Sequence, residues 1–172
     1  MKPLHFIIAG TFLIGTFASC KKEENKSTDL RIRLTDAPYD ASEVNVDIEQ
    51  VRVKFSDDNS DTEGWIDLAT TAGIYNLLDY QNGVDTLLAH AVVPTGRLRE
   101  IRLVLGSDNS IKIGTNVYPL TIPSGSSSGL KIKLDKNLRP DLDSVIVDFD
   151  AALSIFQEGT GDYKLKPVLK IK

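Results

Sequence analysis

The chain is poor in the residue types that many catalytic and metal-binding sites use. Its 172 residues include one cysteine, Cys20, and two histidines, His5 and His90. A single cysteine allows no intramolecular disulfide, and the three side chains cannot supply a Cys/His zinc cluster. A Ser-His or Cys-His nucleophilic site also has little material, because only these two histidines could act as its base.

Neither sign of charge dominates the composition. The sequence has 20 Lys and Arg residues against 24 Asp and Glu residues, and 41% of its residues are hydrophobic. These values are typical of an ordinary globular chain and exclude collagen-like and coiled-coil structures. Because there is no basic excess to neutralise phosphates, we expect no nucleic-acid partner.

The one long apolar run is too short to cross a membrane as a helix. It extends from Phe6 to Ala18, thirteen residues, whereas a spanning helix needs about 20. Its length is that of a signal-peptide core. Ala18 and Ser19 before Cys20 resemble a bacterial lipobox, although Phe17 stands where Leu is usual. We therefore expect a signal peptide over residues 1–19 and lipid attachment at Cys20; the alternative is an ordinary secretory signal with a free cysteine.

Residues 20–28 contain no apolar side chain after Cys20, so we expect a lipid anchor followed by a flexible stalk. The start Cys-Lys-Lys-Glu-Glu resembles the short charged export signal of Bacteroidota lipoproteins. That resemblance implies an outer-membrane protein that is exposed at the cell surface and held there by several acyl chains. The alternative is that these residues are only a polar spacer.

Residues 29–172 are long enough for one domain and show the alternation of half-buried strands. Apolar residues occupy every second position in three runs: Leu30 to Leu34, Leu130 to Leu134 and Tyr163 to Ile171. Between Glu43 and Phe55 the apolar parity switches, which predicts a β-bulge at Glu49-Gln50. Turn residues separate the runs, so the sequence predicts an all-β, antiparallel β-sandwich, with a closed β-barrel as the alternative.

Few apolar residues recur at the spacing of a helix. The best candidates are Ile74 to Leu78 and Ala151 to Gln157, each a turn or two long, and both are also compatible with strands. Asn82-Gly83 predicts a tight hairpin turn, because both residues tolerate a left-handed backbone.

Several spaced motifs resemble one uncharacterised bacterial family, domain of unknown function 4382. They are Leu34-Thr35-Asp36-Ala37-Pro38, Gly64-Trp65, Val93-Pro94-Thr95-Gly96, Ile122-Pro123-Ser124-Gly125, Asp148-Phe149-Asp150-Ala151 and Lys166-Pro167-Val168. The family is similar to prealbumin-like and immunoglobulin-like sandwiches, so the resemblance implies the same fold class. It brings no established activity and no catalytic residues.

Two motifs that suggest catalysis or metal binding fit their context poorly. Gly125 to Gly129 satisfies G-x-S-x-G, but an alternating strand follows Ser127 where the hydrolase motif requires a helix. Asp57, Asn59 and Asp61 have the first spacings of a calcium loop, yet the turn glycine and the final glutamate are missing. We interpret both segments as loops.

Trp65 is the only tryptophan, and we favour a core anchor over a sugar-stacking platform. Seven cationic side chains fall on the outward phase of their strands: Arg31, Arg33, Lys131, Lys133, Lys164, Lys166 and Lys170. They suggest either a face for anionic glycans or, as we prefer, charges that prevent strands of different molecules from pairing.

Asp148 and Asp150 are expected on one face of a strand, with Asp36 near them if the fold brings the strand ends together. Three such carboxylates are candidate ligands for calcium, or an acid and base for glycoside hydrolysis. The alternative, which we prefer, is that they cap turns and accept loop hydrogen bonds. We therefore commit to no cofactor and no metal ion.

Taken together, the sequence predicts a non-enzymatic lipoprotein of the outer membrane that binds a protein or glycan partner or serves as an accessory subunit. A carboxylate-dependent glycosidase and a purely structural envelope protein are the alternatives.

Overall fold

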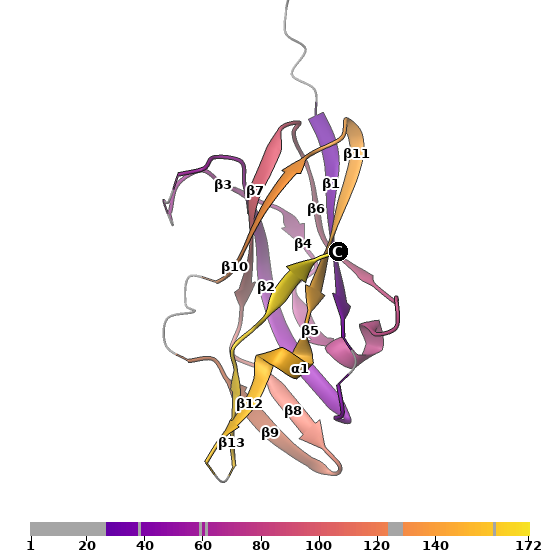
Figure 1. Cartoon of the computed structure of the whole chain (residues 1–172), viewed down its shortest axis with the longest axis vertical. Helices are drawn as coiled ribbons and strands as arrows, with labels where there is room; N and C mark the ends of the chain where they lie inside the picture. Colours follow the sequence, from indigo (N-terminus) through magenta and orange to yellow (C-terminus); the bar gives the residue numbers. More distant parts are fainter. Residues whose placement is uncertain (1–26, 38, 59, 61, 124–128, 160) are drawn as a thin grey trace, which may run out of the picture.

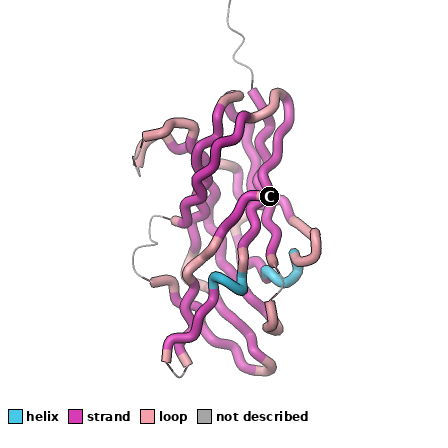
Figure 2. The backbone as a smooth tube through the Cα atoms, viewed as in Figure 1, coloured by secondary structure: helices cyan, strands magenta, loops and turns pink. Residues whose placement is uncertain are grey.

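The computed structural model describes residues 27–37, 39–58, 60, 62–123, 129–159 and 161–172. Strands make up most of this part of the chain (Figure 2). They form two sheets that do not close into a barrel, so the predicted β-sandwich is confirmed and the barrel alternative is wrong.

The first sheet has β1 at its centre. Its strands are, in order, β14 (Leu169–Ile171), β11 (Asp141–Phe149), β1 (Ser27–Asp36), β6 (Thr86–Pro94) and β4 (Ala69–Thr70). β1 pairs antiparallel with β6 but parallel with β11, which lies more than a hundred residues later in the sequence. This sheet is therefore mixed and not purely antiparallel as predicted. Alternation could not predict the parallel pair, because it shows that a strand has a buried face but not the direction of its neighbour.

The second sheet is built around the long strand β2 (Glu43–Lys54). Its main path is β10 (Leu130–Asn137), β7 (Arg97–Leu105), β2, β8 (Ser110–Ile113), β9 (Asn116–Thr121), β13 (Asp162–Leu165) and β12 (Ile155–Glu158). β3 (Trp65–Asp67) and β5 (Gly73–Asn76) also pair with β2. Together these strands give β2 a neighbour along its whole length.

The predicted bulge in β2 is confirmed. Its pairing with β7 shifts register between Ile48 and Gln50, and Glu49 is the residue between them. Val46 and Ile48 before the shift, and Val51 and Val53 after it, are all fully buried. The extra residue keeps both halves of the strand turned toward the core.

Helices are confined to two short turns. Residues Ile74 to Leu78 divide between β5 and a 3₁₀ turn, η1 (Leu77–Tyr80). The second candidate divides between α1 (Ala151–Ser154) and β12. The turn at Asn82-Gly83 has the expected left-handed backbone, with φ of 57° and 87°, but it joins η1 to β6, so the predicted hairpin is wrong. No helix in the described residues is both long and apolar enough to cross a bilayer.

The molecule is elongated, and the start of β1 lies at one end of its long axis (Figure 1). The hairpins β8–β9 and β12–β13 form the opposite end. The buried apolar residues of both sheets form the core between these ends.

Candidate functional site

The parallel pairing of β1 and β11 brings the three candidate carboxylates into one region. In this register Thr35 lies opposite Asp148 and Asp36 opposite Phe149, so both strands end together. Asp36, Asp148 and Asp150 are all buried, with 2%, 5% and 7% of their surface exposed. The expectation that the fold gathers these strand ends is met, but the burial differs from a solvated acidic face.

Asp36 connects β1 to two other segments. One carboxylate oxygen accepts the backbone N–H of Ala151 at 3.0 Å, and the other accepts the side-chain amide of Gln81 at 3.4 Å. Burial raises the pKa of Asp36 to about 6 in spite of these hydrogen bonds, and the negative charge of Asp148 adds to the rise. Asp36 is therefore a costly buried acid that ties the end of β1 to the start of α1.

The alternation predicted that Asp148 and Asp150 share one face of a strand, and for Asp150 this prediction is wrong. β11 ends at Phe149, and Asp150 is the N-cap of α1, where its carboxylate accepts the N–H of Leu153 at 3.1 Å. Its other oxygen accepts a hydrogen bond from the ammonium of Lys170 at 2.9 Å, which lowers the pKa of the carboxyl. The capping bond to the amide ends the strand at this point.

Asp148 is also paired with a lysine, which comes directly after β14. Its Oδ2 lies 3.0 Å from the ammonium of Lys172, while its Oδ1 is buried with no hydrogen-bond partner among the described residues. Within the same residues no group of three or more His, Cys, Asp or Glu side chains is placed to hold a metal ion. Lys170 in β14 and Lys172 directly after it thus supply positive charge where the calcium hypothesis places a cation, and that hypothesis stays an untested alternative.

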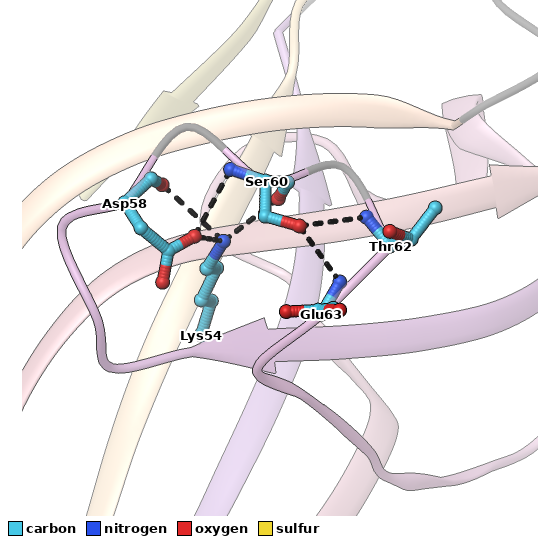
Figure 3. A network of polar contacts seen from close by, with 5 residues as sticks. All are labelled: Lys54, Asp58, Ser60, Thr62 and Glu63. Carbon is cyan, nitrogen blue, oxygen red and sulfur yellow. Dashed lines mark hydrogen bonds and ion pairs between the residues drawn. The ribbon is translucent and has the colours of Figure 1, made fainter.

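The loop with calcium-like spacing is organised around a lysine. The ammonium of Lys54, on a residue only 1% exposed, donates to the carboxylate of Asp58 and to the carbonyls of Asp58 at 3.2 Å and Ser60 at 2.7 Å (Figure 3). Its hydrogen bond lowers the pKa of Asp58 to about 2. Asn59 and Asp61 lie outside the described residues. Oxygen atoms of the kind that would bind a metal cation therefore surround the buried ammonium of Lys54. The sequence alone did not point to this lysine.

Trp65 packs against cations and is not part of the hydrophobic core. The guanidinium of Arg102 lies 3.9 Å from the ring centroid, and Lys54 and Arg52 lie 5.6 and 5.9 Å from it. The register explains the cluster, because Lys54 faces Trp65 across β2–β3 and Arg52 faces Arg102 across β2–β7. Trp65 therefore anchors β3 through cation–π contacts on the outer side of the sheet.

Most of the outward basic residues have acidic partners. Arg31 lies 3.0 Å from Asp29, Lys164 lies 3.8 Å from Glu158, and Arg33 pairs with Asp85. Lys170 binds Asp150 as described above. These ion pairs leave less net positive charge for an anionic glycan than the strand pattern suggested.

His90 is an exposed residue of β6, 4.0 Å from Asp29, and not part of a nucleophilic site in the described residues. Cys20 and Ser127 lie outside the described residues.

One feature had no signal in the sequence analysis. A hollow of about 360 Å³ lies between the turn that joins β7 to β8 and the end of β9. Its lining residues come from two short segments, the β7–β8 turn and the end of β9, which the pairing of β8 with β9 brings together.

Comparison with known proteins gives a family but no function. No curated protein and no solved structure is significantly similar to the chain. The model of one family, described as a domain of unknown function (DUF4382), matches residues 27–167, which is most of the sequence. The chain therefore belongs to the family of domain of unknown function 4382.

Proposed function

We propose that the protein is a lipid-anchored, cell-surface protein of the outer membrane that binds a protein or glycan partner without catalysing a reaction. The support for the anchor is the lipobox-like sequence that ends at Cys20 and the Bacteroidota-type charged residues after it. Lipid chains on Cys20 hold the protein at the bilayer without a spanning segment.

The placement of β1 supports an orientation for this role. β1 begins at one end of the long axis, and the β8–β9 and β12–β13 hairpins lie at the other end (Figure 1). An anchor before β1 therefore directs these hairpins away from the membrane and toward a partner.

The observation that carries a binding role over hydrolysis is the burial of the candidate carboxylates. Asp36 is 2% exposed, Asp150 is paired with Lys170 of β14, and Asp148 is paired with Lys172 directly after that strand. A glycosidase needs an acid and a carboxylate on the two sides of a bound glycosidic bond. These three side chains instead connect parts of the fold, which favours a binding role. The glycosidase and the purely structural envelope protein stay as alternatives.

The anchor is tested by metabolic labelling with a fatty-acid probe. We expect the wild-type chain and the control Ser27→Ala to be labelled and Cys20→Ala to remain unlabelled, because Cys20 carries the only thiol in the sequence. Protease treatment of intact cells should degrade the lipidated protein. Labelling of Cys20→Ala, or full protection of the lipidated wild type, would contradict this part of the proposal.

The binding role is tested by crosslinking and capture from the native outer membrane, together with a glycan-hydrolysis assay. We expect a specific protein or glycan partner and no hydrolysis. Hydrolysis that disappears in Asp148→Asn would establish the glycosidase alternative instead.

A further inference from the structure

We infer that the corner of the first sheet where β1 begins lies in the headgroup region of the bilayer, held there by four exposed apolar residues. The inference rests on the proposed function, because it requires the lipid anchor at Cys20, and it deepens that function by naming the surface that contacts the membrane. The four residues are Val92 and Pro94 in β6, Pro140 directly before β11, and Leu142 in β11. We call them the apolar corner.

The pairing of β1 with its two neighbours brings the apolar corner together. Val92 and Leu142 are the register partners of Asp29 on the two sides of β1. Both therefore lie on the outer face of the sheet, with Cα atoms about 10 Å apart. The two prolines stand two residues further along, toward the β6–β7 and β10–β11 turns, and these turns lie at the same end of the long axis as the start of β1 (Figure 1). The apolar corner is therefore a set of neighbours at one end of the molecule.

These side chains are open to water although they are apolar. Val92 is 74% exposed, the highest value among the large hydrophobic side chains of the described residues, and Leu142 is 48% exposed. Both prolines are exposed as well. Single exposed apolar residues are common on protein surfaces, but neighbouring ones mark contacts with another protein or with a membrane.

The position of the anchor selects the bilayer as the partner of this surface. Cys20 lies seven residues before Ser27, the first residue of β1, and seven extended residues span at most about 25 Å. Lipid chains on Cys20 thus keep the start of β1 close to the bilayer at all times, whereas a protein partner must first be recruited. A surface tethered this near to its partner needs only weak contacts to stay on it, because the effective concentration is high.

The charges beside the apolar corner are paired and do not oppose this contact. Asp29, between the two outer strands, lies 3.0 Å from the guanidinium of Arg31. Arg139 lies next to the corner in sequence and 3.1 Å from the carboxylate of Asp143. Long arginine side chains can lay their stems on apolar surface and keep the guanidinium among the headgroups. Because these acids already have cations, the contact should depend on buried apolar area and not on anionic lipid.

The test is fluorescence quenching of the lipidated protein in phosphatidylcholine vesicles that contain a nitroxide-labelled lipid. A thiol-reactive fluorophore is attached at Val92→Cys, at Leu142→Cys or at the control Val117→Cys. Val117 is a similarly exposed valine, at 63%, in β9 at the other end of the long axis. Cys20 is the only native cysteine and carries the lipid, so each variant has one free thiol. We expect quenching at positions 92 and 142 and none at position 117.

A second pair of variants tests whether apolar contact holds the corner in place. In the chain labelled at Val92→Cys, Leu142→Asp should remove most of the quenching, because a carboxylate resists transfer out of water. Val117→Asp in the same labelled chain should leave the quenching unchanged. Circular dichroism checks that every variant is folded.

Three results would overturn the inference in a chain that is shown to be lipidated, and each would leave the proposed function standing. They are absent quenching at positions 92 and 142, equal quenching at all three positions, and quenching that the folded Leu142→Asp variant does not reduce. Crosslinking of position 92 to a second copy or to another protein, in place of quenching, would assign the corner to that partner and also refute the contact with lipid. A chain that carries no lipid would refute the anchor and this inference together, and the fatty-acid probe identifies that case.

Discussion

Replacing Asp36 with asparagine should stabilise the protein at neutral pH. An asparagine has nearly the same shape and keeps an oxygen that accepts the N–H of Ala151, which the carboxylate accepts at 3.0 Å. The variant cannot ionise, so it avoids the cost of burying a negative charge beside Asp148.

The size of this effect follows from the pKa of Asp36. The fold raises that pKa from 3.8 to about 6. At about 1.4 kcal/mol per tenfold change in the acid dissociation constant, ionised Asp36 reduces the free energy of unfolding by up to about 3 kcal/mol. Because the folded-state pKa is the higher one, the wild type is relieved of this cost below pH 3.8. The cost then grows as the pH rises from 3.8 through about 6 and is complete above it.

The measurement is urea unfolding of the wild type and Asp36→Asn in EDTA at pH 7.5 and at pH 3.5. We expect the variant to be more stable at pH 7.5 and the two chains to have similar stability at pH 3.5. Asp148→Asn is an informative companion, because it removes the neighbouring charge and should lower the pKa of Asp36. Lower stability of Asp36→Asn at pH 7.5 would refute the reasoning, since the ionised carboxylate would then contribute favourably.

The other predictions concern the lysine-centred loop, the acidic cluster and the autonomy of the fold. Lys54→Met should reduce the free energy of unfolding by about 1–3 kcal/mol, because the oxygen atoms around the ammonium lose their donor; the exposed Lys133→Met should change it by less than about 0.5 kcal/mol in the same denaturation assay. Calorimetric titration of the EDTA-treated chain with calcium should show no micromolar binding, and such binding, abolished by Asp148→Asn, would contradict our interpretation of the cluster. Residues 28–172 contain no cysteine and should fold alone, with a circular dichroism spectrum of β type that is unaffected by reductant; substantial helix would contradict this.

The sequence predicted those features that depend on which face of a strand is buried. In β2 the parity of valine and isoleucine located the bulge, because only an extra residue keeps both halves facing the core. The same rule failed for Asp150, where alternation was extended beyond the end of β11 into the cap of α1. Parity describes a strand but does not say where a competing side-chain hydrogen bond ends it.

Contacts between distant segments were not predictable in the same way. Alternation places Lys54 on the outer side of β2, but it does not reveal that a loop and Trp65 cover that side chain. Similarly, the closeness of Asp36 and Asp148 depends on the parallel pairing of β1 and β11, and the direction of that pairing has no local signature. The hollow beside Gly106 depends on how the β7–β8 turn packs against the end of β9, and alternation along one strand does not show this contact.

The central position of β1 also has a mechanical consequence. From Thr28 onward the strand is paired on one side with β11, up to Asp36, and on the other with β6, up to Leu34. A force applied through the residues that precede Ser27 pulls along the strand axis, across hydrogen bonds that are perpendicular to it in the antiparallel pair with β6 and slanted in the parallel pair with β11. Both ladders are then loaded in shear, so many bonds share the load at once instead of opening one after another. A tether attached at this point therefore pulls on the element of the first sheet that is hardest to extract.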